Sequence, residues 1–404
     1  MLNAECQSIF SCWMIGMTET IIWGYTKKWF FCGMWIFDRA KILALSFCCF
    51  ASGCSIDESA GTDMCDGGCT NEMNMKSGRW VAKRLVDSPI IDGTSHSSIG
   101  TNVQGPSVIR VPDWVLGPKG KYYLYFADHK GSYIRLAYAD QLTGPWTIHE
   151  AGSLQLEHSY FPVDPPYLDE SKRESMEQAF RSRGTELPHN LIKELTSPHI
   201  ASPDVHIDNA NKQIIMYYHG LEEAGRQITR VATSKDGINF VALPEMVTER
   251  TYLRTFWHGH QLYGMAMPGQ MYRSIDNFQK FEQGPLLFNS NMRHFAVLLR
   301  QDTLHVFWTQ VGDSPERIMV STIDLDVDFE DWTNSEPAEV LRPERVWEGA
   351  QEPLQPSIRS VAYGLVNQLR DPAIFEESGR VFLLYAVGGE SGIGLAELEW
   401  SGGS

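Results

Sequence analysis

Acidic, basic and imidazole side chains recur beside apolar runs along this 404-residue chain. One apolar segment begins with Arg370-Asp371-Pro372. The next apolar segment along the chain ends with Gly388-Gly389-Glu390. A carboxyl group enclosed by charged neighbours acquires a pKa suited to donating or accepting a proton. Asp371, Glu390, Asp204 and His129 are therefore our candidates for acid–base catalysis. The candidates for substrate binding are Gln104, Asp128, His199, His219, Arg254, His258, Arg293, His294 and Arg370.

These residue types fit three functions, and the sequence leaves all three open. Hydrolysis of a glycosidic bond uses one carboxyl group as acid and a second group as base. The arginines Arg254, Arg293 and Arg370 would instead suit a uronate or a sulfate, with a histidine abstracting a proton as in a polysaccharide lyase. The third function is glycan binding without catalysis. A separate alternative is a structural network in which the buried charges pair with one another, Arg370 with Asp204 or Asp371. No Gly-rich phosphate loop, serine nucleophile elbow or zinc-ligand spacing occurs, so no cofactor and no metal is expected.

Five similar units must position these residues. From residue 79 onward the apolar pattern has a period of two, and each unit has an inner strand, an aromatic-rich second strand and a third strand. The inner strands read GPSVIRV, SPDVHID, YLRTFWH, MRHFAVLLR and LRDPAIF. Five recurrences of one order predict an all-β fold, a five-bladed β-propeller over residues 79–404, rather than a β-sandwich. We expect fourth strands in SLQLEHS and AEVLRPERVWE, and we expect GRWVAKRLVDSPIID to add the outer strand that closes the ring.

In a propeller the starts of the inner strands converge on one face, and the loops after the second strands return to it. We expect the candidate residues to gather there, with Asn102 among them. Residues 157–198, with a helix predicted over residues 169–184, form an insertion between the first two blades. This insertion is expected either to rim that face and shape a pocket or to be a surface decoration.

The chain resembles the five-bladed propeller glycosidases of the glycoside hydrolase family 43 superfamily. The resemblance rests on the five units, on RDPAIFEESGRVFLLY (370–385) and on ASPDVHIDNANKQIIMYYHG (201–220). It implies a carbohydrate substrate from plants or algae and three carboxylates on the first three inner strands, of which only the second is matched, by Asp204. Gly105 occupies the base position, LRTFWHG lacks the acid Glu, and Asp371 resembles the base motif but lies in unit five. The resemblance therefore implies a rearranged set: Asp204 and Asp371, assisted by Glu390 or His129.

The N-terminal region predicts export. All eight cysteines lie at or before Cys69, and a basic pair precedes the apolar stretch Ile42–Phe50 and the sequence Ala51-Ser52-Gly53-Cys54. This pattern is typical of a bacterial lipoprotein signal, with Met34 as a second candidate start and Cys54 as the lipidated residue. We expect a signal region at 1–53, a flexible tether at 54–78, and a periplasmic or outer-membrane lipoprotein, or alternatively a secreted protein. A net charge of −16 argues against nucleic acid as a partner, and a lipid anchor would be the contact with membranes.

Overall fold

The computed structural model describes residues 78–182, 187, 188 and 190–402. Of two units, Met1–Glu72 and Met73–Ser404, the second contains all of these residues. The signal region, Cys54 and the tether up to residue 77 lie outside the described residues, so lipidation and export stay predictions.

Five antiparallel sheets are present, and the first four each consist of four consecutive strands. Blade one contains β3 (Gln104–Arg110), β4 (Tyr122–Ala127), β5 (Tyr133–Ala139) and β6 (Thr147–Gln155). Blade two contains β7 (Ile200–Asp208), β8 (Gln213–Glu223), β9 (Arg226–Ser234) and β10 (Val241–Ala242). Blade three contains β11 (Arg254–His258), β12 (Gln261–Ala266), β13 (Gln270–Ser274) and β14 (Phe281–Leu286).

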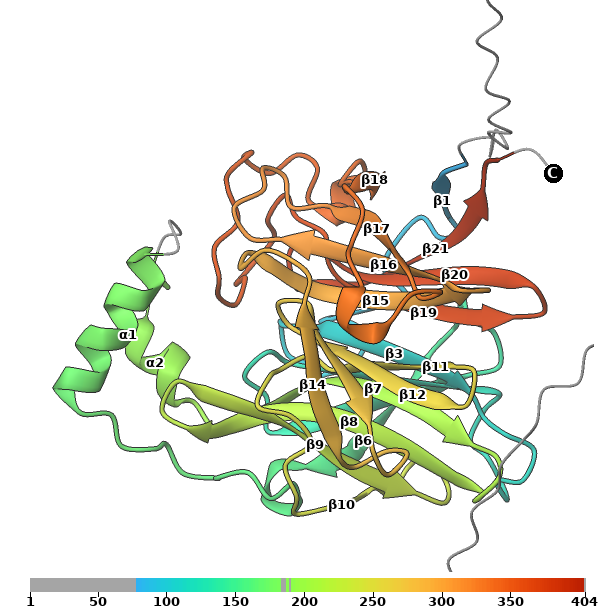
Figure 1. The fold of residues 1–404 in the computed structure, drawn as a ribbon, viewed down its shortest axis with the longest axis horizontal. Coiled ribbons are helices and arrows are strands. Elements are labelled where there is room, and N and C mark those ends of the chain that lie inside the picture. The colour runs from blue at the N-terminus through green and yellow to red at the C-terminus, as the bar shows by residue number, and fades with distance from the viewer. Residues whose placement is uncertain (1–77, 183–186, 189, 403–404) are drawn as a thin grey trace, which may run out of the picture. The chain divides into compact units, whose positions relative to one another are not determined.

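The last two sheets complete the ring. Blade four contains β15 (Met292–Arg300), β16 (Thr303–Gln310), β17 (Ile318–Asp324) and β18 (Ala338–Leu341). Blade five contains β19 (Arg370–Glu377), β20 (Arg380–Val387), β21 (Gly392–Trp400) and, from the N-terminal side, β1 (Trp80–Arg84), with β2 (Ile91–Asp92) also paired to β21. The five sheets confirm the predicted five-bladed propeller (Figure 1).

The first described strand closes the ring, as predicted. β1 pairs antiparallel with β21, from Trp80 opposite Trp400 to Arg84 opposite Ala396. The Trp80 indole is buried and donates a hydrogen bond to His305 Nδ1 of blade four at 3.1 Å. Blade five is therefore assembled from both ends of the described chain.

The second strands pack between the blades. Every residue of β4 is buried, and Tyr125 belongs to one apolar cluster with Tyr218 of β8. Further clusters join blades two and three, three and four, four and five, and five and one. This arrangement is typical of sheets whose two faces are both covered by neighbours. The aromatic runs therefore form the core and leave the polar inner-strand starts to the axis.

The insertion between blades one and two contains two helices. α1 (Glu170–Ser182) agrees with the predicted helix, whereas α2 (Leu191–Thr196) was not predicted. α1 begins after Asp169, whose carboxylate accepts a hydrogen bond from the Lys172 backbone N–H at 2.8 Å. Short 3₁₀ turns lie at Leu156–His158, Phe329–Asp331 and Val346–Glu348. Both helices lie beyond one end of β8 and β9 (Figure 1), and both contact the turn between these strands at Gly225.

Candidate active site

A cavity of about 220 Å³ lies where the inner strands begin. Its wall includes Gln104 of blade one, Ser202 of blade two, Tyr252 before blade three and His294 of blade four. The insertion contributes Met176, Phe180 and Leu195 to the same cavity, so the prediction that it rims this face is confirmed. This volume is smaller than the roughly 300–1,000 Å³ of pockets that bind drug-sized molecules. A cavity of this size suits a ligand of about one sugar ring.

Each blade has one residue in left-handed backbone conformation at the start of its inner strand. These residues are Gly105, Ser202, Tyr252, His294 and Asp371, with φ between 37° and 63°. In four blades the register of the inner strand shifts at this residue. A positive φ is costly for residues other than glycine and persists where the surroundings enforce it, commonly at functional sites. Asp371 is the carboxylate of this set.

Asp371 is fully buried, and neither of its carboxylate oxygens has a hydrogen-bond partner. Burial raises the pKa of Asp371 to about 7, and the negative charge of Glu390 adds to this rise. The Tyr252 hydroxyl is near enough to influence the same pKa, but it forms no hydrogen bond to either oxygen. Near neutral pH a large share of Asp371 is therefore protonated.

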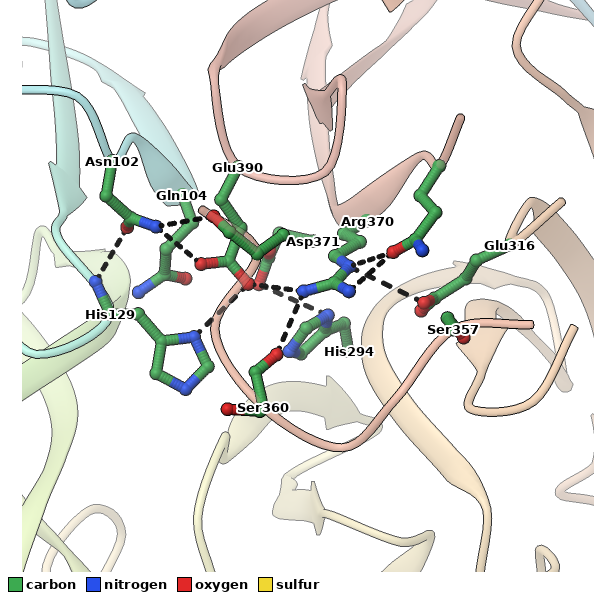
Figure 2. Close-up of polar contacts among 12 residues, drawn as sticks. Asn102, Gln104, His129, His294, Glu316, Ser357, Ser360, Arg370, Asp371 and Glu390 are labelled. Atoms are coloured by element: carbon green, nitrogen blue, oxygen red, sulfur yellow. Dashed lines mark hydrogen bonds and ion pairs between the residues drawn. The ribbon is translucent and has the colours of Figure 1, made fainter. Parts of the chain in front are cut away.

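Glu390 lies beside Asp371 and has the opposite character (Figure 2). Its carboxylate accepts hydrogen bonds from Arg370 Nη1 at 2.6 Å and from Asn102 Nδ2 at 2.7 Å, and its Oε1 is 3.2 Å from His129 Nδ1. Burial opposes ionisation, but His129, Arg370 and Asn102 outweigh it and hold the pKa of Glu390 far below its usual range. One protonated and one ionised carboxyl group are thus adjacent, the pattern of acid–base sites.

Two histidines connect these carboxyl groups to the cavity. His129 and His294 both line the cavity wall, and His294 Nδ1 is 3.6 Å from Asp371 Oδ1. Burial and then the charges of Arg293 and Arg370 hold the pKa of His294 well below its usual range. Asp371 is not part of the cavity wall and lies behind His294.

Several buried polar groups of the site have no hydrogen-bond partner among the described residues. Besides Asp371 they are His219 Nδ1, Tyr252 Oη, Arg254 Nη2 and His294 Nδ1. Burial lowers the pKa of His219 to about 3, so its ring is neutral. Unpartnered buried polar groups are rare and indicate missing water or a bound ligand. Neutral donors and acceptors of this kind suit the hydroxyl groups of a sugar.

Two of the arginines are paired with buried carboxylates. Arg293 donates from Nε to Glu316 Oε1 at 2.9 Å, and Arg370 Nε lies 3.5 Å from Glu316 Oε2. Arg370 also bonds Glu390, and the Arg254 guanidinium lies over the Tyr252 ring at 4.1 Å. Glu316 was not a candidate from sequence. Its position immediately before the third strand of blade four, after Asp313-Ser314-Pro315, is the signal that would have found it.

Asp204 does not line the cavity. It lies two residues beyond Ser202, past the register shift of β7, and its Oδ2 is 2.6 Å from His206 Nε2. The Thr255 N–H donates to the same oxygen at 3.0 Å, and Arg254 Nε is 3.9 Å from Oδ1. Burial alone would raise the pKa of Asp204, but His206 and Arg254 hold it below its usual range. In blade two it is Ser202, and not Asp204, that corresponds to Asp371.

The other candidates differ in position. Gln104 lines the cavity and accepts a hydrogen bond from the Ser202 hydroxyl at 3.3 Å. Asp128 accepts the Lys130 N–H in its own turn, and His199 is buried with Nδ1 2.7 Å from the Ser197 carbonyl. His258 was expected at the start of an inner strand, and this prediction is wrong.

His258 instead ends β11, at the opposite end from the cavity, where its ring contacts Asp302 at 2.9 Å. The five-residue strand begins at Arg254, so His258 is carried away from the site. Across the described ranges no group of three or more His, Cys, Asp and Glu could hold a metal ion, and no described helix is long and apolar enough to cross a membrane.

Solved structures that resemble the chain include glycoside hydrolases. The exo-β-1,3-galactanase of Phanerochaete chrysosporium gives a TM-score of 0.48 at 10% identity over 80% of this chain, and the chain spans 64% of that protein. A GH43 β-xylosidase/α-arabinofuranosidase from a compost metagenome gives 0.47 at 11% identity, over 79% of this chain and 95% of that one. Both scores are below 0.5, so the five-bladed assignment rests on the strand order and register described above.

Comparison of sequences identifies a relative. No family model matches the chain. The uncharacterized protein R118 of Acanthamoeba polyphaga mimivirus is 32% identical over 350 residues, which cover 80% of this chain and 91% of the relative. The chain therefore belongs to the same protein family as this mimivirus protein.

Proposed function

We propose that this protein is a glycoside hydrolase that cleaves a terminal sugar in the cavity at the propeller axis. The observation that carries the proposal is the pair of adjacent buried carboxyl groups, Asp371 and Glu390, whose pKa values are shifted in opposite directions. Two titratable groups driven apart in this way indicate an acid and a base.

The wall of the cavity supports a sugar as ligand. Gln104, Tyr252, His219 and His294 provide neutral hydrogen-bonding groups, and several of them have no partner in the described protein. The cavity volume and the roof formed by α1 and α2 favour a single ring at a chain end over an extended polysaccharide.

Hydrolysis is favoured over β-elimination because Arg293 and Arg370, two of the three arginines that suggested a uronate, are engaged. Arg293 and Arg370 form ion pairs with Glu316 and Glu390, so their charges are balanced before any ligand binds. A lyase acting on an anionic glycan needs cationic groups that remain available to the substrate.

A panel of plant and algal oligosaccharides tests the proposal. We expect new reducing ends without the ultraviolet absorbance of unsaturated uronates. Asp371→Asn should lower turnover by roughly 10²–10⁴-fold, the usual contribution of acid–base catalysis, while Asp204→Asn, outside the cavity, serves as the matched control. Release of unsaturated products, or binding of glycans without cleavage, would contradict hydrolysis.

A further inference from the structure

We infer that two histidines, rather than the carboxyl groups themselves, meet the substrate: His294 as the acid supplied by Asp371, and His129 as the base held by Glu390. This inference rests on the proposed function and assigns the groups that carry it out. Its basis is the arrangement of two imidazole–carboxyl pairs on one cavity (Figure 2).

His129 is held in a fixed orientation. Its Nδ1 is 3.2 Å from Glu390 Oε1, and its backbone N–H donates to Asn102 Oδ1 at 2.9 Å. Asn102 also donates to Glu390 Oε2 at 2.7 Å, so one amide positions both partners. An ionised carboxylate only accepts hydrogen bonds. Nδ1 therefore carries the hydrogen, and the free electron pair is on Nε2, which points away from Glu390 in Figure 2.

His294 has the opposite arrangement. Its Nδ1 faces Asp371 at 3.6 Å and has no hydrogen-bond partner, while its ring lines the cavity. A protonated Asp371 donates to Nδ1, which leaves the hydrogen of a neutral ring on Nε2. Such contacts are often long without substrate and shorten when it binds. The backbone of His294 is left-handed, and the ring lies 5.1 Å from that of Tyr252, which fixes its direction.

Together the two imidazole–carboxyl pairs supply and remove the protons that the cleavage of one glycosidic bond requires. His294 gives its Nε2 hydrogen to the glycosidic oxygen and receives the Asp371 proton at Nδ1. The carbon–oxygen bond breaks, and the leaving group departs as an alcohol. A water molecule forms the new bond to the anomeric carbon and gives one proton to His129 Nε2, where Glu390 stabilises the imidazolium. Proton exchange with solvent then restores both pairs, so one water is consumed for each bond cleaved.

Other titratable groups lie around both rings and influence their protonation. His129 is faced by Glu390, Asp371, Glu194, Lys130, His199, His219 and His294. His294 is faced by Asp371, Arg293, Arg370, Arg359 and His129. Burial, and then the charges of Arg293 and Arg370, lower the pKa of His294 and keep its ring neutral. A neutral ring can donate its Nε2 hydrogen while it receives another at Nδ1.

A test that needs no substrate is the tautomeric state of the two rings. In the full protein labelled with ¹⁵N-histidine, we expect His129 as the Nδ1–H form and His294 as the Nε2–H form at neutral pH. Assignment uses His129→Gln and His294→Gln, with circular dichroism and thermal unfolding to show that each variant folds. The same tautomer at both positions would overturn the inference.

Kinetics on a cleaved oligosaccharide provide the second test. His129→Ala and His294→Ala should each lower kcat by about 10²–10⁴-fold, and added imidazole should restore part of the loss in His129→Ala. His258→Ala, at the far end of β11, is the matched histidine control. Full activity of His129→Ala beside an inactive Asp371→Asn would overturn the inference and leave the hydrolase intact. Failure of the wild type on every glycan would overturn both.

Discussion

Asp371 combines three unfavourable features that seldom persist without a function. It is a buried carboxyl group without a hydrogen bond, its backbone is left-handed, and it adjoins the ionised Glu390. Each feature costs free energy of folding. The residue is therefore better explained by chemistry than by stability.

Asp371→Asn should change how stability depends on pH. Because the pKa of Asp371 rises from 3.8 unfolded to about 7 folded, the folded state holds a proton that the unfolded state loses. The bound proton contributes to the free energy of unfolding in full below pH 3.8. This contribution is lost as the pH rises toward 7, by up to about 1.4 kcal/mol per pH unit. Urea unfolding across this range should show a flatter profile for Asp371→Asn, which is more stable than the wild type at pH 8. An unchanged profile would mean that Asp371 is not protonated in the folded protein.

Asp204→Asn should have the opposite signature. The pKa of Asp204 is below its usual range despite burial, since His206, Arg254 and the Thr255 N–H favour the charged form. The ionised carboxylate of Asp204 stabilises the folded state at any pH above the pKa that Asp204 has in the unfolded chain. This stabilisation is lost as the pH falls through the lower pKa that Asp204 has in the folded protein. We expect a loss of about 1–3 kcal/mol at neutral pH in urea titrations, a smaller loss in acid, and turnover within a few-fold of wild type. Loss of turnover in a stable, folded variant would return Asp204 to the catalytic set.

The sequence predicted part of the cluster of polar side chains at this face of the propeller. Asp371, Glu390, His129 and Arg370 gather as expected, but Asp204 was misplaced because the register shift at Ser202 moves the following side chains to other faces. Alternation along a strand cannot show such a shift. Tyr252 was also missed, since it precedes its strand by two residues and resembles core aromatics.

At the scale of elements, α2 is tied to the cavity wall by one carboxylate. Glu194 Oε1 pairs with Lys130 Nζ at 3.0 Å, and Oε2 accepts from the Ser360 hydroxyl at 2.9 Å. The three residues come from α2, from the loop after β4 and from the loop before β19. The roof of the cavity is therefore joined to blades one and five.

Glu194→Gln should loosen this roof. The amide cannot replace the ion pair with Lys130, so the backbone of α2 should exchange hydrogen faster and KM should rise several-fold with kcat less affected. Hydrogen exchange followed by mass spectrometry over residues 187–200 and steady-state kinetics measure the two effects. Glu170→Gln, in an exposed pair on α1, should change neither. Equal protection of α2 in both variants would show that Glu194 does not hold the roof.

Elements with strong periodicity were predictable, and short ones were not. The inner and second strands and α1 agree with the sequence pattern, because each alternates or repeats over at least five residues. α2 has six residues and β10 has two. Elements this short give too few residues to show a period, and their stability depends on packing against neighbouring elements.

On the scale of the whole propeller, five similar blades carry one asymmetric site. The residues equivalent to Asp371 in the other blades are Gly105, Ser202, Tyr252 and His294, none of them a carboxylate. Gly105 could not simply be exchanged, since a Cβ there would lie 2.9 Å from Ser202 Cα. The repeated backbone provides equivalent positions, and only on blades four and five do the side chains at these positions form the imidazole–carboxyl pair of His294 and Asp371.

The site depends on a ring that stays closed, and one buried carboxylate secures the closure. Glu348, fully buried after blade four, accepts hydrogen bonds from Arg84 Nε of β1 at 2.7 Å and from the Tyr385 hydroxyl of β20 at 3.0 Å. Arg84→Ala leaves this carboxylate buried without its cation, so we expect a loss of about 3–5 kcal/mol. The exposed pair of Arg300 and Glu376 is the control, and Arg300→Ala should cost no more than about 1 kcal/mol.

Urea unfolding distinguishes the two variants. For Arg84→Ala we expect a lower midpoint with an unchanged slope, because the same surface is exposed when the whole ring unfolds. A shallower slope together with loss of activity before global unfolding would indicate that β1 detaches alone. In that case β21 becomes an open sheet edge, and the variant should aggregate. A loss for Arg84→Ala as small as that for Arg300→Ala would show that closure rests on strand pairing and the apolar packing of Trp80, and not on Glu348.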